Sequence, residues 1–373
     1  MNLKNCKYLA KIGFAVAGIA AALMAAGCSK KSESRTMPAP AAGTGQIDAA
    51  NLQLITDTEE KERDDFSTNV RTLVRQGNFK LLESQASFYR AHKASFPDGT
   101  WKLAGFYGAF GDLPNETSEQ GWQDLNQQLQ EWDRENTNSI TPLLALAQFY
   151  RGYAWHARGG DWGDKVTDEG SRLMGERLRQ SLGCLQNARK LLPAEPDDEY
   201  YAIALRVCLG VGIDRTTYEK IFTEAVKNTP DNMAIYEQKA YYLLPRWYGQ
   251  PGEWETFARA MSKRKDIPGS EEIFARCALH LRDLGIFYDE FSYSDDSWND
   301  LKASFHALEQ NYPDSLAIKS TFCLISGKLD DYQEGRAQMK LLGTNVDQSV
   351  WGSKDNFMGA VQWFGSDDAS LED

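Results

Sequence analysis

The chain has 373 residues, of which 42% are hydrophobic and 25% charged, with 41 Lys and Arg against 53 Asp and Glu. This composition excludes wholesale disorder, and the length allows a large core without support from disulfides. The net charge of −12 is a poor match for nucleic-acid phosphates or for an anionic lipid surface. Nucleic acid is therefore not expected as a partner.

Residues 1–27 have the features of a bacterial lipoprotein signal peptide. Three lysines accompany an apolar run, 12–26, that is too short to span roughly 30 Å of hydrocarbon comfortably. The run ends in small residues, and Cys28 and Ser29 follow. We expect cleavage before Cys28, lipidation of its thiol, and sorting to the outer membrane with the protein facing the periplasm. An ordinary secretory peptide and an uncleaved anchor are the alternatives.

Residues 28–58 are predicted to form a flexible tether, because the stretch 37–45 is rich in Pro, Ala and Gly and has little to bury. From residue 59 to 373 the sequence predicts one helical domain. The membrane contact is thus expected to be the N-terminal lipid only.

The apolar residues of this domain recur with a period of 3.6 residues. A first helix is expected to end at Gly77, with Asn78 capping the next one. Another apolar stripe consists of Trp122, Leu125, Leu129 and Trp132, and a long helix is predicted over 166–192. Runs of alternating β-branched residues are absent from the sequence. The predicted fold class is therefore all-α.

The second half of the domain repeats a pattern. Four prolines, Pro196, Pro230, Pro268 and Pro313, are each expected to open a helix, with separations of 34, 38 and 45 residues. These separations lie near or above the ~34-residue tetratricopeptide (TPR) period. The sequence predicts a TPR-like helical-repeat solenoid of stacked antiparallel helix pairs, with an irregular α-bundle as the alternative.

Four segments carry a further likeness. They are FPDGTWKL at 96–103, YAWHARG at 153–159, YYLLPRWYGQPGEW at 241–254 and VWG at 350–352. In this order and spacing they resemble an uncharacterised bacterial family of TPR-like proteins, a domain of unknown function. The resemblance covers about residues 60–365. It implies an architecture and brings no activity or catalytic residue with it.

Motifs for catalysis and metal binding are missing from the sequence. It contains no G-x-S-x-G, P-loop, H-E-x-x-H or C-x-x-C motif, and its four histidines are not spaced as metal ligands. We therefore predict no catalytic residue, no cofactor and no metal site. Cys184, Cys208, Cys277 and Cys323 lie in apolar helical patterns and are expected to be buried thiols, although their spacing leaves disulfide pairing open.

Two loops are candidates for ligand contact, because aromatic rings and arginines there accompany several glycines. The candidate binding residues are Trp155, Arg158 and Trp162 in the first loop and Arg246, Trp247 and Trp254 in the second. Packing between helix pairs, and pairing of Arg246 with a nearby acid, are the alternative interpretation.

The functional hypothesis is a lipid-anchored periplasmic scaffold that binds a protein or peptide in its concave groove. The sequence leaves two alternatives open. One is a lipoprotein that captures a glycan or small ligand with the Trp and Arg loops, and the other is a hydrolase with a dispersed acidic site.

Overall fold

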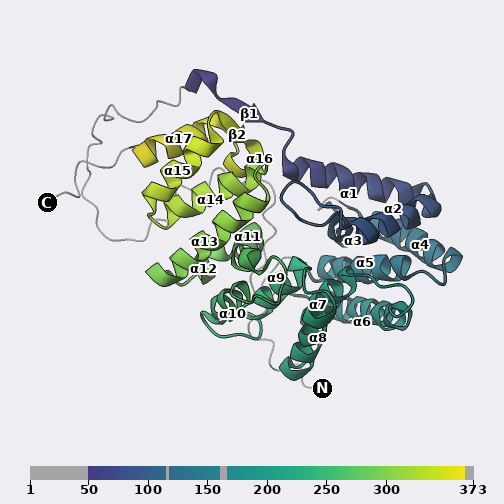
Figure 1. The fold of residues 1–373 in the computed structure, drawn as a ribbon. Helices are drawn as coiled ribbons and strands as arrows, with labels where there is room; N and C mark the ends of the chain where they lie inside the picture. The colour runs from purple at the N-terminus through teal and green to yellow at the C-terminus, as the bar shows by residue number, and fades with distance from the viewer. Residues whose placement is uncertain (1–48, 115–116, 160–165, 366–373) are drawn as a thin grey trace. The chain divides into compact units, whose positions relative to one another are not determined.

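The computed structural model describes residues 49–114, 117–159 and 166–365. Within them lie seventeen α-helices, a few short 3₁₀ turns and two strands of three residues each (Figure 1). The prediction of an all-α fold is confirmed. No helix of the described part is both long and apolar enough to cross a membrane.

The contacts divide the described residues into two compact units, where the sequence predicted one domain over 59–373. The first unit comprises residues 63–307, and the second comprises residues 49–62 together with 308–365. Helices α1 and α13 run across the boundaries of the first unit. With them, this unit contains α1 (Glu59–Arg75), α2 (Phe79–His92), α3 (Lys102–Gly111), α4 (Glu119–Glu135), α5 (Ile140–Arg158), α6 (Asp168–Leu191), α7 (Glu199–Val211), α8 (Arg215–Asn228), α9 (Met233–Tyr242), α10 (Glu253–Ser262), α11 (Ile273–Asp283), α12 (Phe287–Glu290) and α13 (Asp295–Asn311).

Apolar spacing and capping explain individual helices. The four stripe residues of α4 are all buried, and the Ser118 side chain accepts a hydrogen bond from the Gly121 amide at the start of the helix. Gly77 follows α1 with φ +66°, as its place after a helix predicts. Asn78 occupies the expected capping position of α2, but its side chain makes no cap hydrogen bond. That detail of the sequence interpretation is wrong.

The proline positions are confirmed as helix starts. Helices α7, α9 and α14 begin three residues after Pro196, Pro230 and Pro313, and Pro268 precedes a 3₁₀ turn (η4, Ser270–Glu272) that leads into α11. Asp214 and Asn232 cap α8 and α9 with side-chain hydrogen bonds to backbone amides.

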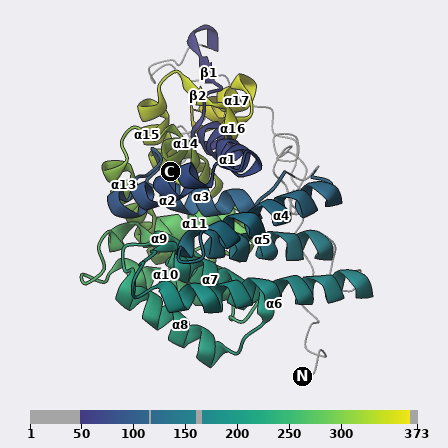
Figure 2. The ribbon, with the colours of Figure 1, turned by 90° about the vertical axis from the view of Figure 1, so that its right-hand side faces the viewer.

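From α5 to α11 the helices pack in a regular order. Helix α5 packs against α6 and α7, α7 against α8 and α9, and α9 against α10 and α11. Each even-numbered helix also contacts the odd-numbered helix that follows it. Figure 2 shows the long helices α4, α5 and α6 one above the other. We refer to α5, α7, α9 and α11 as the odd row.

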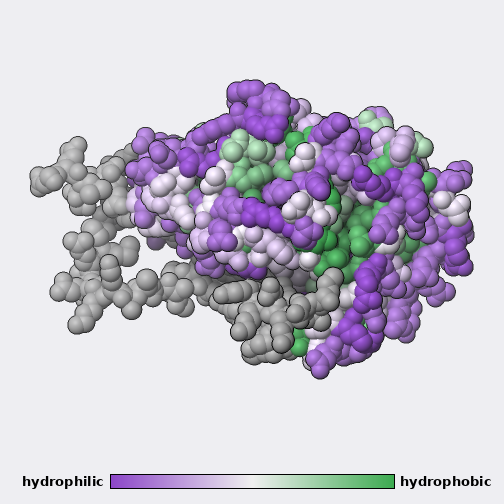
Figure 3. Space-filling model, turned by 90° about the horizontal axis from the view of Figure 1, so that it is seen from below, coloured by the Kyte–Doolittle hydropathy of each residue, from purple (hydrophilic) through white to green (hydrophobic). Residues whose placement is uncertain are grey.

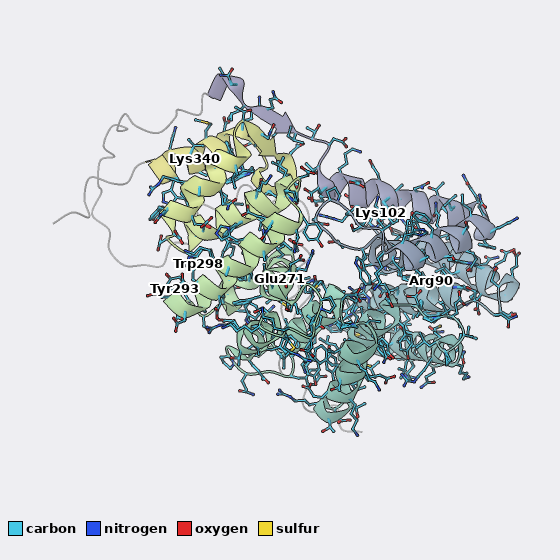
Figure 4. The ribbon with its side chains drawn as sticks, in the orientation of Figure 1. Arg90, Lys102, Glu271, Tyr293, Trp298 and Lys340 are labelled. Carbon is cyan, nitrogen blue, oxygen red and sulfur yellow. The ribbon has the colours of Figure 1, made fainter. Side chains whose placement is uncertain are left out.

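Close backbone contact joins α3 to α5. A Cβ atom on Gly152 would lie 1.9 Å from the carbonyl oxygen of Gly111, so only glycine fits at this crossing. Arg90 of α2 (labelled in Figure 4) holds the first turn of α5 and the residues before α7 together. Its guanidinium donates to Asp197 (2.9 Å), Glu195 (3.1 Å) and Thr141 (3.0 Å).

The second unit contains α14 (Leu316–Lys328), α15 (Tyr332–Leu342), α16 (Gln348–Trp351) and α17 (Lys354–Gly365). Strand β1 (Gln53–Ile55) pairs in parallel with β2 (Asn345–Asp347). The buried cluster of this unit includes Leu52, which precedes β1, Val346 of β2, and Trp351 and Phe357 from the last helices. Strand β1 and a 3₁₀ turn at Ala49–Asn51 fall inside the stretch expected to be a flexible tether, so regular structure starts before residue 59.

The four cysteines of the described body are free thiols. Burial raises the pKa of Cys184 to about 12 and that of Cys208 to about 11, and it also raises those of Cys277 and Cys323. Thiols with raised pKa values are poor nucleophiles at neutral pH, so these side chains serve as small apolar groups.

The surface reflects the composition of the chain. In the space-filling view of Figure 3, hydrophilic residues cover much of the described surface that faces the viewer, and hydrophobic residues emerge in patches among them.

Candidate functional site

The two candidate loops meet at a pair of tryptophans. Trp155 lies in the last turn of α5 and Trp247 in the connection from α9 to α10, and their ring centroids are 6.2 Å apart with an interplanar angle of 82°. Both side chains are partly exposed. The Arg158 guanidinium lies over the Trp155 ring at 5.6 Å and donates to the Gly159 carbonyl at 3.1 Å. Two tryptophans 92 positions apart in the sequence thus form one partly exposed aromatic pair, with the buried Arg158 guanidinium over one ring.

A tight backbone turn places Trp247. The amides of Trp247 and Gly249 both donate to the Leu244 carbonyl, at 2.9 and 3.2 Å. A Cβ atom on Gly249 would lie 1.8 Å from the Leu243 carbonyl oxygen, so this turn requires glycine there. The result is an edge-to-face contact between Trp247 and Tyr241 with a centroid distance of 5.6 Å. The sequence-based interpretation of these glycines as turn residues is confirmed.

Arg246 and Trp254 converge on Glu290 of α12. The Arg246 guanidinium donates to the Glu290 carboxylate at 3.0 Å, and the Trp254 indole donates to the Glu290 carbonyl at 3.0 Å. Trp254 is fully buried against Phe274 and Phe287. It therefore belongs to the core, whereas the partly exposed Arg246 remains at the surface near Trp247. The two other candidates, Cys28 and Trp162, lie outside the described residues.

The aromatic surface continues onto α11 through residues that the sequence interpretation missed. Tyr241 and His280 are 6.1 Å apart between ring centroids, and the Gln238 side-chain nitrogen lies 3.3 Å from His280 Nε2. We call Trp155, Trp247, Tyr241 and His280 the aromatic path. Tyr241 and His280 look like ordinary helix residues in the sequence, and only the packing of α9 against α11 brings them together.

Burial and positive charge govern the ionisation of the path. Burial lowers the pKa of His280 to about 3, and the charge of Arg206 adds to this effect, so the imidazole is neutral at pH 7. Burial raises the pKa of Tyr241, which is opposed in part by Trp247 and by the charges of three arginines. These arginines are Arg246, Arg151 and Arg158. The rings of the path are thus uncharged at pH 7.

Arg151 lies one helical turn before Trp155 on α5. Arg151, Trp155 and Arg158 are four and three residues apart, a spacing that places them on one side of the helix. Arg151 donates to Asp112 at 2.7 Å and to Gln148 at 2.9 Å. The spacing is a signal that the sequence interpretation did not use.

Two carboxylates and one guanidinium lie beside the path on α7 and α9. Glu199 is 1% exposed, and one of its oxygens accepts a hydrogen bond of 3.0 Å from Asn232. Its other oxygen is buried with no hydrogen-bond partner among the described residues. Burial raises the pKa of Glu199 to about 7, and that of the partly exposed Glu237 also to about 7. The charge of Arg206 lowers both pKa values in part.

No ion pair joins Arg206 to either carboxylate within 4.0 Å in the part of the chain that the structure describes. Arg206 acts on them at longer range, from a partly exposed position two turns after Glu199 on α7. The charge of Arg276 also lowers the pKa of Glu237 in part, and Arg276 is itself paired with Glu272 at 2.7 Å. The described residues contain no group of three or more His, Cys, Asp or Glu side chains arranged to hold a metal ion.

Comparison of the sequence with protein-family models finds no match, and comparisons with curated proteins and with solved structures find no significant match either.

Proposed function

We propose that the chain is a lipid-anchored helical-repeat scaffold of the bacterial cell envelope, facing the periplasm, that binds a protein or peptide partner. The packing order of α5 to α11 supports this proposal, because stacked helix pairs place each odd-numbered helix against the next two helices and each even-numbered helix against the one that follows it. In such a stack the odd row would line the concave face. This is the TPR-like arrangement that the proline spacing predicts.

The single observation that carries the proposal is the Trp155–Trp247 pair, with the buried Arg158 over the Trp155 ring and the partly exposed Arg246 next to Trp247 in the chain. Partly exposed tryptophans and arginines are the residues most often found at binding hot spots. Trp155 lies at the end of α5 and Trp247 in the connection after α9, so two distant parts of the chain form this surface. Capture of a glycan is the second candidate, since exposed tryptophan faces also suit sugars.

A hydrolase with paired carboxylates fits the geometry less well. Hydrolysis by a carboxylate pair requires both groups to reach the substrate. Glu199 is 1% exposed, which leaves Glu237 as the reachable one of the two carboxylates whose pKa is raised to about 7. We therefore propose binding without catalysis.

Site-specific photo-cross-linking in intact cells tests the binding proposal. A photoreactive phenylalanine derivative in place of Trp155 should give discrete adducts, and the same group in place of Lys227, on the exposed side of α8, should not. Identical adduct patterns from both positions would contradict a dedicated binding surface. A glycan array probed with the purified protein distinguishes glycan capture from peptide binding. If a sugar is the ligand, the protein should bind selected glycans and Trp247→Ala should abolish that binding.

Cys28→Ala tests the anchor. The variant should appear in the soluble periplasmic fraction, whereas the parent chain should remain with the outer membrane and incorporate radiolabelled palmitate. Unchanged fractionation of the variant would contradict lipid anchoring.

A further inference from the structure

We propose that the connection from α11 to α13 is a second docking surface, and that it binds a basic segment of a partner protein. The surface consists of three large side chains and three carboxylates, which are Leu284, Tyr288, Tyr293, Asp289, Asp295 and Asp296. We call it the tyrosine surface. It shares no residue with the Trp155–Trp247 pair, so the inference goes beyond the function proposed above.

The three large side chains of the tyrosine surface are open to solvent. Their exposed fractions are 39% for Leu284, 46% for Tyr288 and 53% for Tyr293. Only seven large hydrophobic side chains are exposed in the part of the chain that the structure describes, and these three lie within ten residues of one another. Single exposed side chains are ordinary, whereas a local group of them indicates an interaction surface.

The segment that carries these side chains is fixed from its inner side. Phe287 is fully buried, and its ring centroid lies 6.3 Å from that of Trp254. The Trp254 indole donates to the Glu290 carbonyl at 3.0 Å, and the Ser292 amide donates to the Glu255 carboxylate at 2.7 Å. The two exposed tyrosines directly follow Phe287 and Ser292 in the chain. A partner would therefore bind an ordered segment and avoid the entropy cost of ordering a loop.

The charge of this stretch differs from that of the whole chain. Residues 283–301 contain six carboxylates and no lysine, arginine or histidine, although the chain has 41 Lys and Arg against 53 Asp and Glu. Three of the six carboxylates form ion pairs inside the fold: Asp283, Glu290 and Asp300. The other three, Asp289, Asp295 and Asp296, form no ion pair within 4.0 Å with any residue that the structure describes. They leave a local excess of negative charge.

This negative charge lies next to the exposed rings. The hydroxyl of Tyr293, a residue labelled in Figure 4, donates to the Asp295 carboxylate at 3.3 Å. Asp295 and Asp296 are in the first turn of α13, where the helix dipole favours their ionised form. Asp289 directly follows Tyr288 in the chain. Each exposed tyrosine thus has a carboxylate close to it.

A lysine or arginine of a partner suits both components of such a surface. Its cationic group can pair with a carboxylate while it lies over a tyrosine ring, whose face attracts cations. Leu284 offers an apolar contact to the methylene groups of a basic side chain or to an apolar neighbour. An acidic partner would be repelled by the same carboxylates. The ligand class is therefore a short segment with several basic residues and an apolar residue between them.

Fluorescence anisotropy of the full chain in nonionic detergent tests this proposal. The probe is a labelled peptide amide of sequence Arg-Leu-Arg-Ala-Lys-Leu, at roughly 50 mM salt so that screening is weaker than at physiological ionic strength. The comparison peptide has Gln at each basic position. We expect the basic peptide to bind about tenfold more tightly than the neutral one. Equal affinities would overturn the proposal.

Two matched triple variants locate the effect of charge. The first replaces the carboxylates of the tyrosine surface: Asp289→Asn, Asp295→Asn and Asp296→Asn. The control replaces three exposed acids on α1 and α4: Asp64→Asn, Glu131→Gln and Glu135→Gln. Both variants lose the same net charge, but only the first should lose most of the preference for the basic peptide. Equal losses would indicate unspecific attraction by the net charge and overturn the assignment.

A double variant tests the rings. Tyr288→Ser combined with Tyr293→Ser should weaken binding of the basic peptide about fivefold, because two cation–ring contacts are lost. Phe88→Ser removes a ring that is 52% exposed on α2 and should leave the affinity unchanged. Circular dichroism must show native melting for each variant, and unchanged affinity of a folded double variant would overturn the assignment.

Trp247→Ala separates this inference from the proposed function. The variant should bind the basic peptide as tightly as the parent chain, because the tyrosine surface does not include Trp247. Loss of binding in Trp247→Ala would assign the basic peptide to the Trp155–Trp247 pair and overturn the tyrosine surface. Failure of the peptide to bind any form of the chain would overturn the tyrosine surface alone, since cross-linking from position 155 tests the proposed function independently.

Discussion

Ser315 Oγ lies 2.9 Å from one carboxylate oxygen of Glu59 and 3.0 Å from the other, although 256 residues separate the two in sequence. The same carboxylate accepts a hydrogen bond of 3.2 Å from the Ala317 amide. The first residue of α1 thus satisfies donors at the start of α14, where amides lack helical partners and the helix dipole favours a negative charge.

Glu59→Ala should destabilise the second unit by about 1–3 kcal/mol, because it leaves two donors at the start of α14 without their acceptor. Hydrogen exchange followed by mass spectrometry should show faster exchange over 316–328. Asp64→Ala, an exposed change on the same helix, is the control and should leave that exchange unaltered. Equal exchange in the two variants would contradict the role of Glu59.

Gly152→Ala should destabilise the first unit by more than about 3 kcal/mol or prevent folding, since the new methyl group would overlap the Gly111 carbonyl. Gly183→Ala is the matched control within α6. Its Cβ atom meets nothing within 4 Å, so the change should stabilise the protein by about 0.5–1 kcal/mol. Urea unfolding measures both changes, and similar midpoints for the two variants would argue against the α3–α5 contact.

Removing the charge of Glu219 should lower the stability of the protein more than removing the charge of its partner Lys239. The Lys239 side chain is 3% exposed and pairs with Glu219, which is 41% exposed. Glu219→Gln leaves a buried ammonium without its carboxylate and should cost about 2–4 kcal/mol. Lys239→Met leaves a carboxylate that water and Arg215 can still stabilise, so it should be nearly neutral. Thermal unfolding at pH 7 compares them, and equal losses would refute the asymmetry.

Glu199→Gln should change the pH dependence of stability. The pKa of Glu199 is raised to about 7 in the folded protein, above its ordinary value of 4.5, so the folded state holds the proton more tightly. Its contribution to the free energy of unfolding is therefore fully present below pH 4.5 and is lost as the pH rises through 7. Relative to the parent chain, Glu199→Gln should gain stability between pH 5 and 8.

The expected gain is roughly 2–3 kcal/mol, because one pKa unit corresponds to about 1.4 kcal/mol. Guanidinium unfolding at pH 5 and pH 8 measures the difference between the two chains. Exposed Glu135→Gln is the control and should show no such divergence. A constant difference between Glu199→Gln and the parent at both pH values would contradict the burial of an ionisable carboxyl.

The sequence predicts helices well where one periodic stripe faces one neighbour. The prediction from the stripe Trp122 to Trp132 is confirmed because all its members are buried on one side of α4. The prediction from Pro230 is confirmed because proline suits the approach to a first helical turn. Strand β1 is different. It has three residues, and its partner lies about 290 positions later in the chain, so no local pattern reveals it.

The candidate site was likewise predicted only in part. The aromatic and glycine residues around Trp155 and Trp247 indicated both loops as candidates for ligand contact. Composition alone does not distinguish an aromatic ring at the surface from one in the core. Trp254 illustrates this, because its position in the first turn of α10 directs it against Phe274 of α11. Tyr241 and His280 become neighbours only through helix packing, which depends on contacts between positions 39 residues apart.

The β1–β2 pair has a mechanical consequence for a chain held at its N-terminus. Among the described residues Gln53–Ile55 precedes every α-helix, so a pull from the N-terminal side loads the hydrogen bonds to Asn345–Asp347 before it loads α1. The bonds of a parallel pair are evenly spaced, so tension along the strand loads them together. Residues 345–347 thus hold residues 53–55 against such a pull, and the force reaches α1 only after the hydrogen bonds between the two strands break.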